Sequence, residues 1–296
     1  MNEIKDIIKS LNGFYKGYKN SRGLIGAVAS VAWIPKKDTS FELITYRFEE
    51  KWGTMRLIDD ECVKKIDRLY PTTFDNYDYE NKHNRIVPNS PCPILYGIRG
   101  DDPNDLIKSS SLIKSENVYS WIIFQTNQGT DDHLQNRNIK QVKPFESVMI
   151  KGKIIDKPHT IKGGHVFFTI SNEFKEKIDC AAYEPTKQFR NIIRELLIGD
   201  IVEVYGGVRK KPLTINIEKI FIKKLVDDFI KLENPICPNC KKHMKSRGKN
   251  QGYKCLKCKT KKLYADRKKK VRKINYGFYE VPVCARRHLS KPLKRF

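Results

Sequence analysis

The chain has 296 residues and a formal net charge of +24, from 58 lysines and arginines against 34 acidic residues. It contains no apolar run long enough for a membrane-spanning helix, and its first residues lack the apolar stretch of a secretory signal. These features exclude a transmembrane helix and argue against secretion. We therefore expect a cytoplasmic protein whose excess positive charge favours a polyanionic partner such as nucleic acid.

The first 138 residues alternate between helical and strand patterns. Apolar residues between Ile4 and Leu11 recur with the spacing of one helix face. Residues 22–31 are small and apolar, which indicates a tightly packed buried element, and residues 71–93 indicate a loop with one short strand near Ile86. The other predicted elements are strands at 41–48, 93–99 and 118–125 and helices at 59–70 and 104–115. This alternation predicts a ferredoxin-like α+β sandwich for residues 1–138.

Residues 139–226 have a different pattern, with five strand-like segments and one helix. The predicted strands are 146–155, 163–170, 177–183, 200–205 and 213–220, and the helix is 186–197. Three strands, a helix and two strands is the order of an OB-fold barrel. Such barrels bind single-stranded or looped nucleic acid on one face, although a small barrel can also serve only for packing.

Two Cys-x-x-Cys pairs lie near the C-terminus. Cys237 and Cys240 are separated from Cys255 and Cys258 by 14 residues, which is the ligand spacing of a zinc ribbon. Four thiolates leave no open coordination position, so the spacing predicts a structural zinc ion and not a catalytic one. We assign residues 227–296 to this zinc ribbon and a basic C-terminal tail.

The positive charge is concentrated in the same region. Residues 231–296 carry 22 lysines and arginines against three acidic residues, so about 19 of the 24 net charges lie there. A charge run is often only solvated surface, but beside an OB barrel it favours contact with phosphates. The candidate contacts are Lys241, Lys245, Arg247, Lys249, Arg286, Arg287, His288 and Lys291.

Two polar segments of the first domain are candidates for substrate chemistry. Asp131, Asp132 and His133 follow a predicted strand and have the groups needed for ligands or general bases. In residues 71–81, acidic and aromatic residues alternate, a combination that can hold a guanidinium or an amine. A capped turn and a tyrosine-rich surface loop would show the same patterns, so both interpretations stay open.

Several longer strings are specific enough to suggest a family. They are Arg22-Gly-Leu-Ile-Gly-Ala, Tyr70-Pro-Thr-Thr-Phe-Asp-Asn, Pro91-Cys-Pro-Ile-Leu-Tyr-Gly-Ile-Arg-Gly, Thr126-Asn-Gln-Gly-Thr-Asp-Asp-His-Leu, Gly163-Gly-His-Val-Phe-Phe and Ala285-Arg-Arg-His-Leu-Ser-Lys-Pro-Leu. From about residue 20 to its C-terminus the chain resembles the archaeal isoleucine tRNA 2-agmatinylcytidine synthetase (TiaS) family. The resemblance implies a ferredoxin-like domain, an OB fold and a zinc ribbon, in the order predicted above.

The resemblance also implies a function. The family uses ATP to join agmatine to position 2 of the wobble cytidine of the AUA-reading isoleucine tRNA, whose anticodon is CAU. ATP, agmatine and magnesium would then be ligands of the complete enzyme, a ligase. We expect this chain to bind the tRNA and to form part of the substrate site. The substrate contacts that we expect are Arg22, Asp75, Tyr77, Asp78 and Asn127.

One departure from the family pattern bears on activity. The family begins with an ATP-using, kinase-like region that carries an Asp-Asp-Thr-Asp motif, and this motif does not occur here, because Asp131-Asp132 is followed by His133. We expect either a second polypeptide that carries the region or a chain that starts at an internal methionine. The alternative function is a non-catalytic OB and zinc-ribbon protein that binds RNA or single strands.

Overall fold

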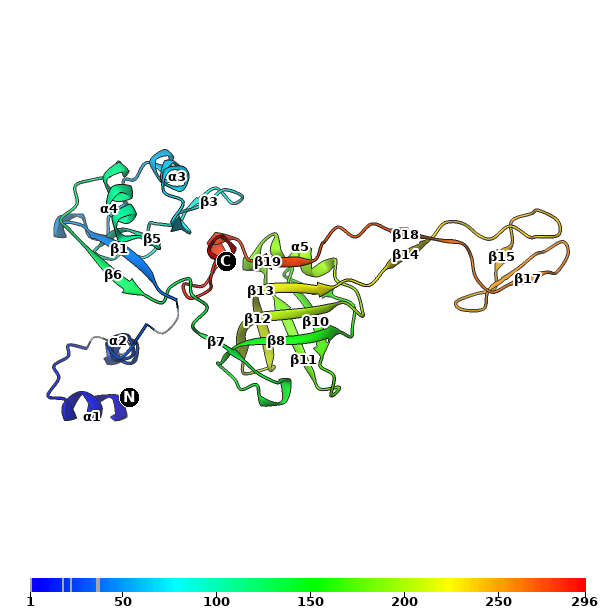
Figure 1. Ribbon diagram of the computed structural model, residues 1–296, viewed down its shortest axis with the longest axis horizontal. Coiled ribbons are helices and arrows are strands. Elements are labelled where there is room, and N and C mark those ends of the chain that lie inside the picture. The colour runs from blue at the N-terminus through cyan, green and yellow to red at the C-terminus, as the bar shows by residue number, and fades with distance from the viewer. Residues whose placement is uncertain (1, 18, 22, 36–37) are drawn as a thin grey trace. The chain divides into compact units, whose positions relative to one another are not determined.

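The computed structural model describes residues 2–17, 19–21, 23–35 and 38–296. The chain forms two compact units, one of residues 1–76 and 86–132 and the other of residues 77–85 and 133–296. Figure 1 follows the chain through its elements. None of the described helices is both long and apolar enough to cross a membrane.

The first unit is built on a four-stranded antiparallel sheet. Its strands are β1 (Ser40–Tyr46), β2 (Thr73–Phe74), β5 (Ile94–Gly100) and β6 (Ser120–Thr126), in the spatial order β2-β5-β1-β6. Helices α3 (Asp60–Leu69) and α4 (Pro103–Leu112) lie together on one face of this sheet (Figure 1). This order, with a helix after β1 and another after β5, confirms the ferredoxin-like prediction.

Capping and apolar spacing explain both helices. The side chain of Asp59 accepts a hydrogen bond from Glu61 N at 3.0 Å, and Asp102 does the same for Asn104 N at 2.8 Å, so each helix begins at a capping aspartate. Val63 and Ile66 of α3 and Leu106 of α4 are fully buried against the sheet. Burying such side chains contributes about 1.5–3 kcal/mol each.

One sequence prediction for this unit was wrong. Residues 23–31 are not a buried element: helix α2 (Leu24–Val31) buries only Leu24 and lies beside the short helix α1 (Asn2–Ser10). The 71–93 segment is mostly loop, as predicted, and a short strand, β4 (His83–Asn84), lies close to Ile86. The segment also contains β2 and β3 (Tyr77–Asp78), and β3 and β4 form a hairpin that belongs to the second unit.

A buried ion pair fixes one end of the sheet. The fully buried Arg47 donates from Nε to Glu116 Oε1 at 2.7 Å and from Nη2 to Glu116 Oε2 at 2.9 Å, and it also bonds Thr54. These hydrogen bonds from Arg47 lower the pKa of Glu116. A carboxyl with a lowered folded-state pKa adds stability above its unfolded pKa, and this stability is lost as the pH falls through the folded value.

We therefore expect Glu116→Gln to reduce the free energy of unfolding of this unit by about 3–5 kcal/mol at pH 7, since it leaves Arg47 buried without its partner charge. The difference from wild type should shrink as the pH falls below about 4. Urea unfolding followed by tryptophan fluorescence measures it, because all three tryptophans of the chain lie in this unit. A difference that stays constant down to about pH 3 would contradict the expectation.

The second unit is dominated by a closed five-stranded barrel. Its strands are β8 (Ser147–Ile154), β10 (Val166–Ser171), β11 (Lys177–Ala182), β12 (Ile201–Arg209) and β13 (Thr214–Lys224). β8 pairs with β10 and β12, β13 pairs with β12 and β11, and β11 pairs with β10, which closes the barrel. Helix α5 (Phe189–Arg194) lies between β11 and β12 in the chain, so the OB-fold prediction is confirmed.

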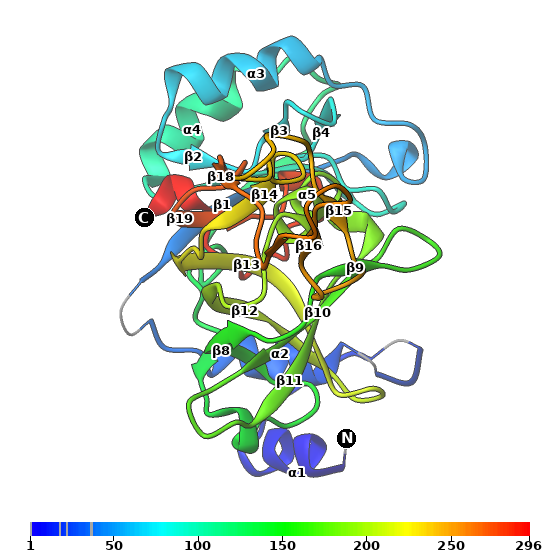
Figure 2. The same ribbon diagram turned by 90° about the vertical axis from the view of Figure 1, so that its right-hand side faces the viewer.

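Alternation along the strands fills the barrel with one apolar core. In β10, Val166, Phe168 and Ile170 point inward, whereas Phe167 and Thr169 are partly exposed. In Figure 2, β8, β12 and β13 lie side by side across this core. Gly206 sits where β12 bends, and any Cβ there would lie 2.0 Å from Asn216 O, so only glycine fits.

The C-terminal tail packs on the barrel. Strand β19 (Gly277–Glu280) pairs with β13, and Glu280 accepts hydrogen bonds from Arg286 and, at 3.0 Å, from Leu293 N. The ring of Phe296 packs against Phe278 at 5.0 Å. The C-terminal tail is therefore ordered and docked on the barrel. Two short strands, β7 (Leu134–Asn136) and β9 (His159–Thr160), extend the barrel sheet at its edges.

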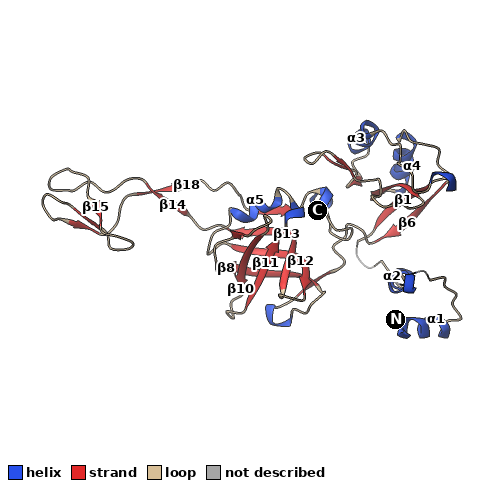
Figure 3. Cartoon of the chain, turned by 180° about the vertical axis from the view of Figure 1, so that it is seen from behind, coloured by secondary structure: helices blue, strands red, loops and turns tan. Residues whose placement is uncertain are grey.

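The ribbon has little regular structure (Figure 3). Its strands are β15 (Lys245–Ser246), β16 (Tyr253–Lys254) and β17 (Lys261–Lys262), and its base is a two-stranded ladder of β14 (Asp228–Lys231) and β18 (Arg267–Lys270). Its hydrophobic core cluster has three buried residues, Cys237, Met244 and Cys255. So small a core cannot hold a fold by apolar burial alone, and such modules depend on a metal.

Candidate metal centre and nucleic-acid interface

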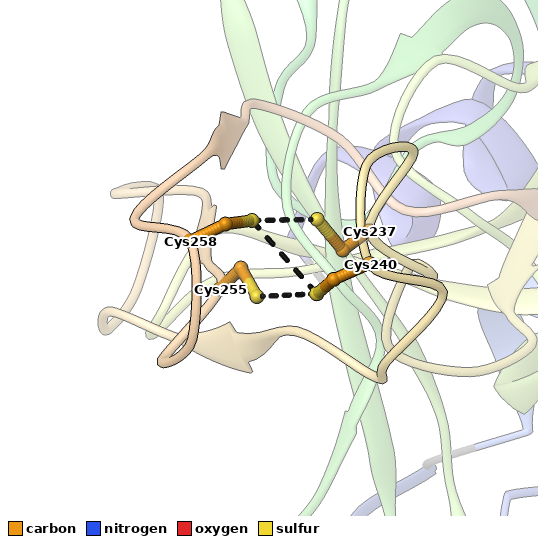
Figure 4. Close-up of side chains that lie close together, drawn as sticks. All are labelled: Cys237, Cys240, Cys255 and Cys258. Carbon is orange, nitrogen blue, oxygen red and sulfur yellow. Dashed lines mark hydrogen bonds between the residues drawn. The ribbon is translucent and has the colours of Figure 1, made fainter.

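The four cysteines of the two pairs converge at one point of the ribbon (Figure 4). Cys237 Sγ lies 3.2 Å from Cys258 Sγ, Cys240 Sγ lies 3.3 Å from Cys255 Sγ, and Cys258 Sγ lies 3.8 Å from Cys240 Sγ. All four sulfur atoms lie within 4.8 Å of one another. Four sulfurs at about 2.3 Å from one zinc ion are roughly 3.8 Å apart, so the donor set fits tetrahedral zinc.

Backbone geometry makes each pair a knuckle. Lys241 N donates to Cys237 O and Lys259 N donates to Cys255 O, both at 3.0 Å, and Lys241 and Lys259 both have positive φ. The two turns are thus equivalent, and each presents two sulfurs to the same side. Hydrogen bonds from the Thr260 hydroxyl, 3.1 Å from Cys258 Sγ, from the Thr260 backbone and from Cys237 lower the pKa of Cys258 to about 6, which favours the thiolate that binds metal.

The basic candidates of the ribbon are on its surface. Lys241, Lys245, Arg247 and Lys249 are all exposed, between the first and second knuckles. Strand β18 adds four consecutive exposed cations. Surface cations without buried partners are available to phosphates, so this placement agrees with the predicted phosphate contacts without testing them.

The tail candidates divide into exposed and buried groups. Arg287 and His288 are exposed, and Lys291 is half-buried beside the ring of Phe296. Arg286 differs, because its side chain is only 6% exposed and is bound to Glu280. Its guanidinium binds Glu280 and Val281 O within the tail, so little of it is left to contact a phosphate.

The 126–133 segment is a compact turn. Thr130 Oγ1 donates to Asn127 O at 2.6 Å, and Asp132 accepts from Asn127 Nδ2 and from Trp33 Nε1, each at 3.3 Å. Asp131 has a positive φ of 62°. The boundary between the two units falls after Asp132.

His133, on the barrel side of that boundary, points away from solvent. Its Nε2 lies 2.9 Å from Glu218 Oε1, Arg287 Nη1 lies 3.6 Å from Glu218 Oε2, and the His133 and Glu218 side chains are 9% and 5% exposed. The contact between His133 and Glu218 ties the start of the second unit to strand β13. The catalytic prediction for Asp131, Asp132 and His133 stays a prediction.

The acidic and aromatic segment is more buried than a surface loop. Asp78, 2% exposed, accepts from Asn81 N at 3.0 Å and from Cys284 N at 2.9 Å, and Tyr77 is 7% exposed and packs on Tyr79. The boundary between the units also falls after Asn76, so Asp75 belongs to the first unit and Tyr77 and Asp78 to the second. Burial gives Tyr77 and Asp78 a structural role, which the sequence pattern did not reveal. Arg22 lies outside the described residues.

Sequence reasoning missed a buried ion pair at the base of the ribbon. The fully buried Asp200 accepts from Leu197 N and Val226 N, both at 2.8 Å, and from Arg272 Nη2 at 2.7 Å. Arg272 also donates to Val226 O at 2.9 Å. The segment that leads into the ribbon, at Val226, and the segment that leads out of it, at Arg272, therefore both bind the Asp200 carboxylate. Asp200 follows a glycine turn and Arg272 lies in a lysine run, so neither carried a signal.

A ferredoxin-like domain, an OB barrel and a four-cysteine ribbon in one basic chain define a multidomain protein of the nucleic-acid-binding class. Comparison with known families agrees with this architecture. Residues 21–133 match the TiaS FLD domain, residues 148–222 match an OB-fold nucleic acid binding domain, and residues 234–274 match the TiaS C-terminal zinc ribbon domain.

The chain is similar along its whole length to curated relatives. It is 48% identical over 290 residues to the isoleucine tRNA 2-agmatinylcytidine synthetase TiaS of Methanocaldococcus jannaschii, covering 97% of this chain and 67% of that protein. It is 47% identical to the Archaeoglobus fulgidus protein of the same name, over 94% of this chain and 66% of that one. The chain spans about two thirds of the length of these relatives.

Solved structures of similar proteins give the same result. A complex of TiaS with its isoleucine tRNA and ATP matches with a TM-score of 0.85 at 44% identity, over all of this chain and 69% of that one. A complex of TiaS with the same tRNA, AMPCPP and agmatine matches with a TM-score of 0.83 at 43% identity, again over all of this chain and 69% of that one. The chain belongs to the TiaS family.

Proposed function

We propose that this chain takes part in the ATP-dependent joining of agmatine to position 2 of the wobble cytidine of isoleucine tRNA, in line with the names of its relatives. The observation that carries the proposal is the match of the whole chain, at 44% identity, to a protein crystallised with isoleucine tRNA and ATP. The ribbon and barrel would bind the tRNA, and zinc would hold the ribbon together.

The chemistry needs an activated base. The oxygen at position 2 of cytosine is a poor leaving group, and transfer of a phosphoryl group from ATP to it makes a phosphate that the primary amine of agmatine can displace. Magnesium bound to ATP would offset the charge on the phosphates. Within this chain, the turn that holds the half-buried Asn127 and the exposed Asp132 is our candidate for substrate contact, and the exposed cations of the ribbon are candidates for the RNA backbone.

We propose further that the ATP-using groups come from a second polypeptide. An exposed apolar surface on the first unit supports this: Ile122 and Phe124 of the edge strand β6 are each 43% exposed and lie on the sheet face that α3 and α4 leave open. Exposed apolar patches of this kind mark interaction surfaces. The partner would carry the ATP-using, kinase-like region of the family.

An incorporation assay tests this function. Radiolabelled agmatine, ATP, magnesium and an isoleucine tRNA transcript with a CAU anticodon are incubated with this chain, alone and with the separately expressed N-terminal third of the Methanocaldococcus jannaschii relative. We expect label in the tRNA only in the mixture. Absence of label in both reactions would overturn the synthetase proposal in favour of a non-catalytic RNA-binding protein. Incorporation of label by the chain alone would overturn only the proposal that a second polypeptide supplies the ATP-using groups.

The phosphate contacts have their own test. Replacing Lys241, Lys245, Arg247 and Lys249 with alanine should weaken the binding of tRNAs of different sequence to the same extent. It should also reduce the slope of log K against log salt by about 1 for each phosphate that is no longer neutralised, because fewer counterions are released. The matched control removes four cations from helices of the first unit, Lys5, Lys65, Arg68 and Lys108. Equal effects of the two sets would argue against a specific role of the ribbon.

A further inference from the structure

A row of aromatic rings lies on the outer surface of the barrel, away from the cysteine centre. His159 of β9 and Phe167 of β10 are directly paired residues, and their rings stack with centroids 6.3 Å apart and planes 25° apart. Phe167 meets Tyr183 edge-on at 5.9 Å. We call His159, Phe167 and Tyr183 the aromatic strip. Its outward direction follows from β10, where Phe168 points into the core.

The strip is held in place by its surroundings. Arg190 Nη1 donates to Gly164 O at 2.6 Å and Arg194 Nε donates to Thr160 Oγ1 at 3.1 Å, so helix α5 fixes the turn that follows β9. Gly164 has a φ of +81°, and any Cβ there would lie 2.6 Å from Arg190 Nη1. A rigid platform loses little entropy when a ligand binds, which favours recognition.

A shallow pocket with two carboxylates adjoins the strip. It is lined by His159, Phe167, Thr169, Asp156 and Asp179. Asp156 Oδ1 accepts from Thr169 N at 2.5 Å, and the Thr169 hydroxyl lies 3.2 Å from Asp156 Oδ2 and 2.8 Å from Asp179 Oδ1. Each carboxylate has about four lone-pair sites, so both can accept a further hydrogen bond from a ligand.

Cations flank the strip on its other sides. Arg209 Nη1 donates to Tyr183 Oη at 3.2 Å, and Arg190 and Arg194 lie behind the β9 turn. Flat rings with arginines around them suit a nucleic-acid strand, because bases stack on the rings while phosphates meet the cations. Paired RNA hides its bases inside the helix, so only unpaired nucleotides can use such a surface.

We propose that the aromatic strip binds unpaired nucleotides of the tRNA, and that Asp156 and Asp179 select a base with an exocyclic amino group. The inference rests on the proposed function, since it assigns a binding element within it. Bases stack on His159 and Phe167, and the amino group of cytosine, adenine or guanine donates to the two carboxylates. Uracil has no amino group and presents carbonyl oxygens to them, so it is disfavoured.

The test measures tRNA affinity by anisotropy with the full chain. Replacing His159 with alanine and Phe167 with leucine removes two rings while keeping apolar volume at residue 167, and we expect affinity to fall about 10-fold for each ring removed. Phe167→Tyr keeps the ring and should retain affinity even where Phe167→Leu loses it. His83→Ala and Phe174→Leu, two exposed rings outside the strip, are the controls and should bind like wild type.

Two further arms identify the nucleotides and their bases. An isolated anticodon stem-loop and a tRNA lacking its 3′ single strand separate the two sources of unpaired nucleotides, because only the RNA that retains the bound segment responds to the ring substitutions. Short oligomers of one base test selection: wild type should bind oligo-uridine more weakly than oligo-cytidine, and Asp179→Asn should narrow that difference.

The outcomes separate this inference from the proposed function. If wild type binds no tRNA, the proposed function fails. If wild type binds and the double ring variant, shown by its thermal midpoint to be folded, binds equally well, the aromatic strip is not a binding element. Competition by free agmatine for the strip would assign the rings and carboxylates to a small cation and overturn the RNA inference.

Discussion

Changing Cys255 to serine is expected to remove the metal and unfold the ribbon, while the barrel stays intact. The ribbon has almost no apolar core, so its stability comes from metal binding, for which apparent free energies of about 10–16 kcal/mol are typical of small zinc modules. Removing one of the four ligands removes most of this metal-binding free energy. The exposed cations of the ribbon then lose their fixed arrangement, and tRNA affinity should fall by about 10-fold or more.

Two measurements check this expectation. Metal analysis of the purified protein should give one zinc per wild-type chain and far less in Cys255→Ser. Amide hydrogen exchange should show loss of protection between residues 237 and 262 and unchanged protection in the barrel. Cys92→Ser, which alters a half-buried thiol of the first unit, should keep its zinc. Full ribbon protection in the metal-free protein would contradict a structural role for zinc.

Replacing Asp200 with alanine is expected to destabilise the second unit by about 3–5 kcal/mol, since it leaves a largely buried guanidinium without its partner charge. The side chains of Asp200 and Arg272 are 0% and 10% exposed, and Val226 N loses its acceptor as well. For a unit of this size the thermal midpoint should fall by roughly 10 °C. Circular dichroism, and not tryptophan fluorescence, measures this change, because the second unit has no tryptophan.

The control for Asp200 is an ion pair nearer to solvent on the same barrel. Glu203 and Lys223 are 15% and 34% exposed in their side chains, and Glu203→Gln should cost no more than about 1 kcal/mol. Asp200→Ala and Arg272→Met should also destabilise less in combination than the sum of their separate effects, because they share one interaction. Simple additivity of the two changes would show that Asp200 and Arg272 do not act as a pair.

The sequence predicted the architecture well where the signal was local. Cysteine spacing indicated the metal site, and strand and helix periods, taken in order, predicted both the ferredoxin-like domain and the barrel. The prediction failed where the burial of a segment was inferred from its composition alone. The 22–31 segment is apolar enough for a core, yet whether a helix is buried depends on its neighbours, and α2 lies beside α1 with only Leu24 of its own residues buried.

The candidate site divides in the same way. The sequence by itself determined the four ligands and the basic ribbon, because two Cys-x-x-Cys pairs at this separation have the ligand spacing of a zinc ribbon and a charge excess needs no fold to be counted. Only the tertiary structure decided the roles of residues that meet across long separations. Arg286 is buried against Glu280, Asp78 meets Cys284, and Asp200 meets Arg272, since folding brings together groups whose separation in sequence carries no signal.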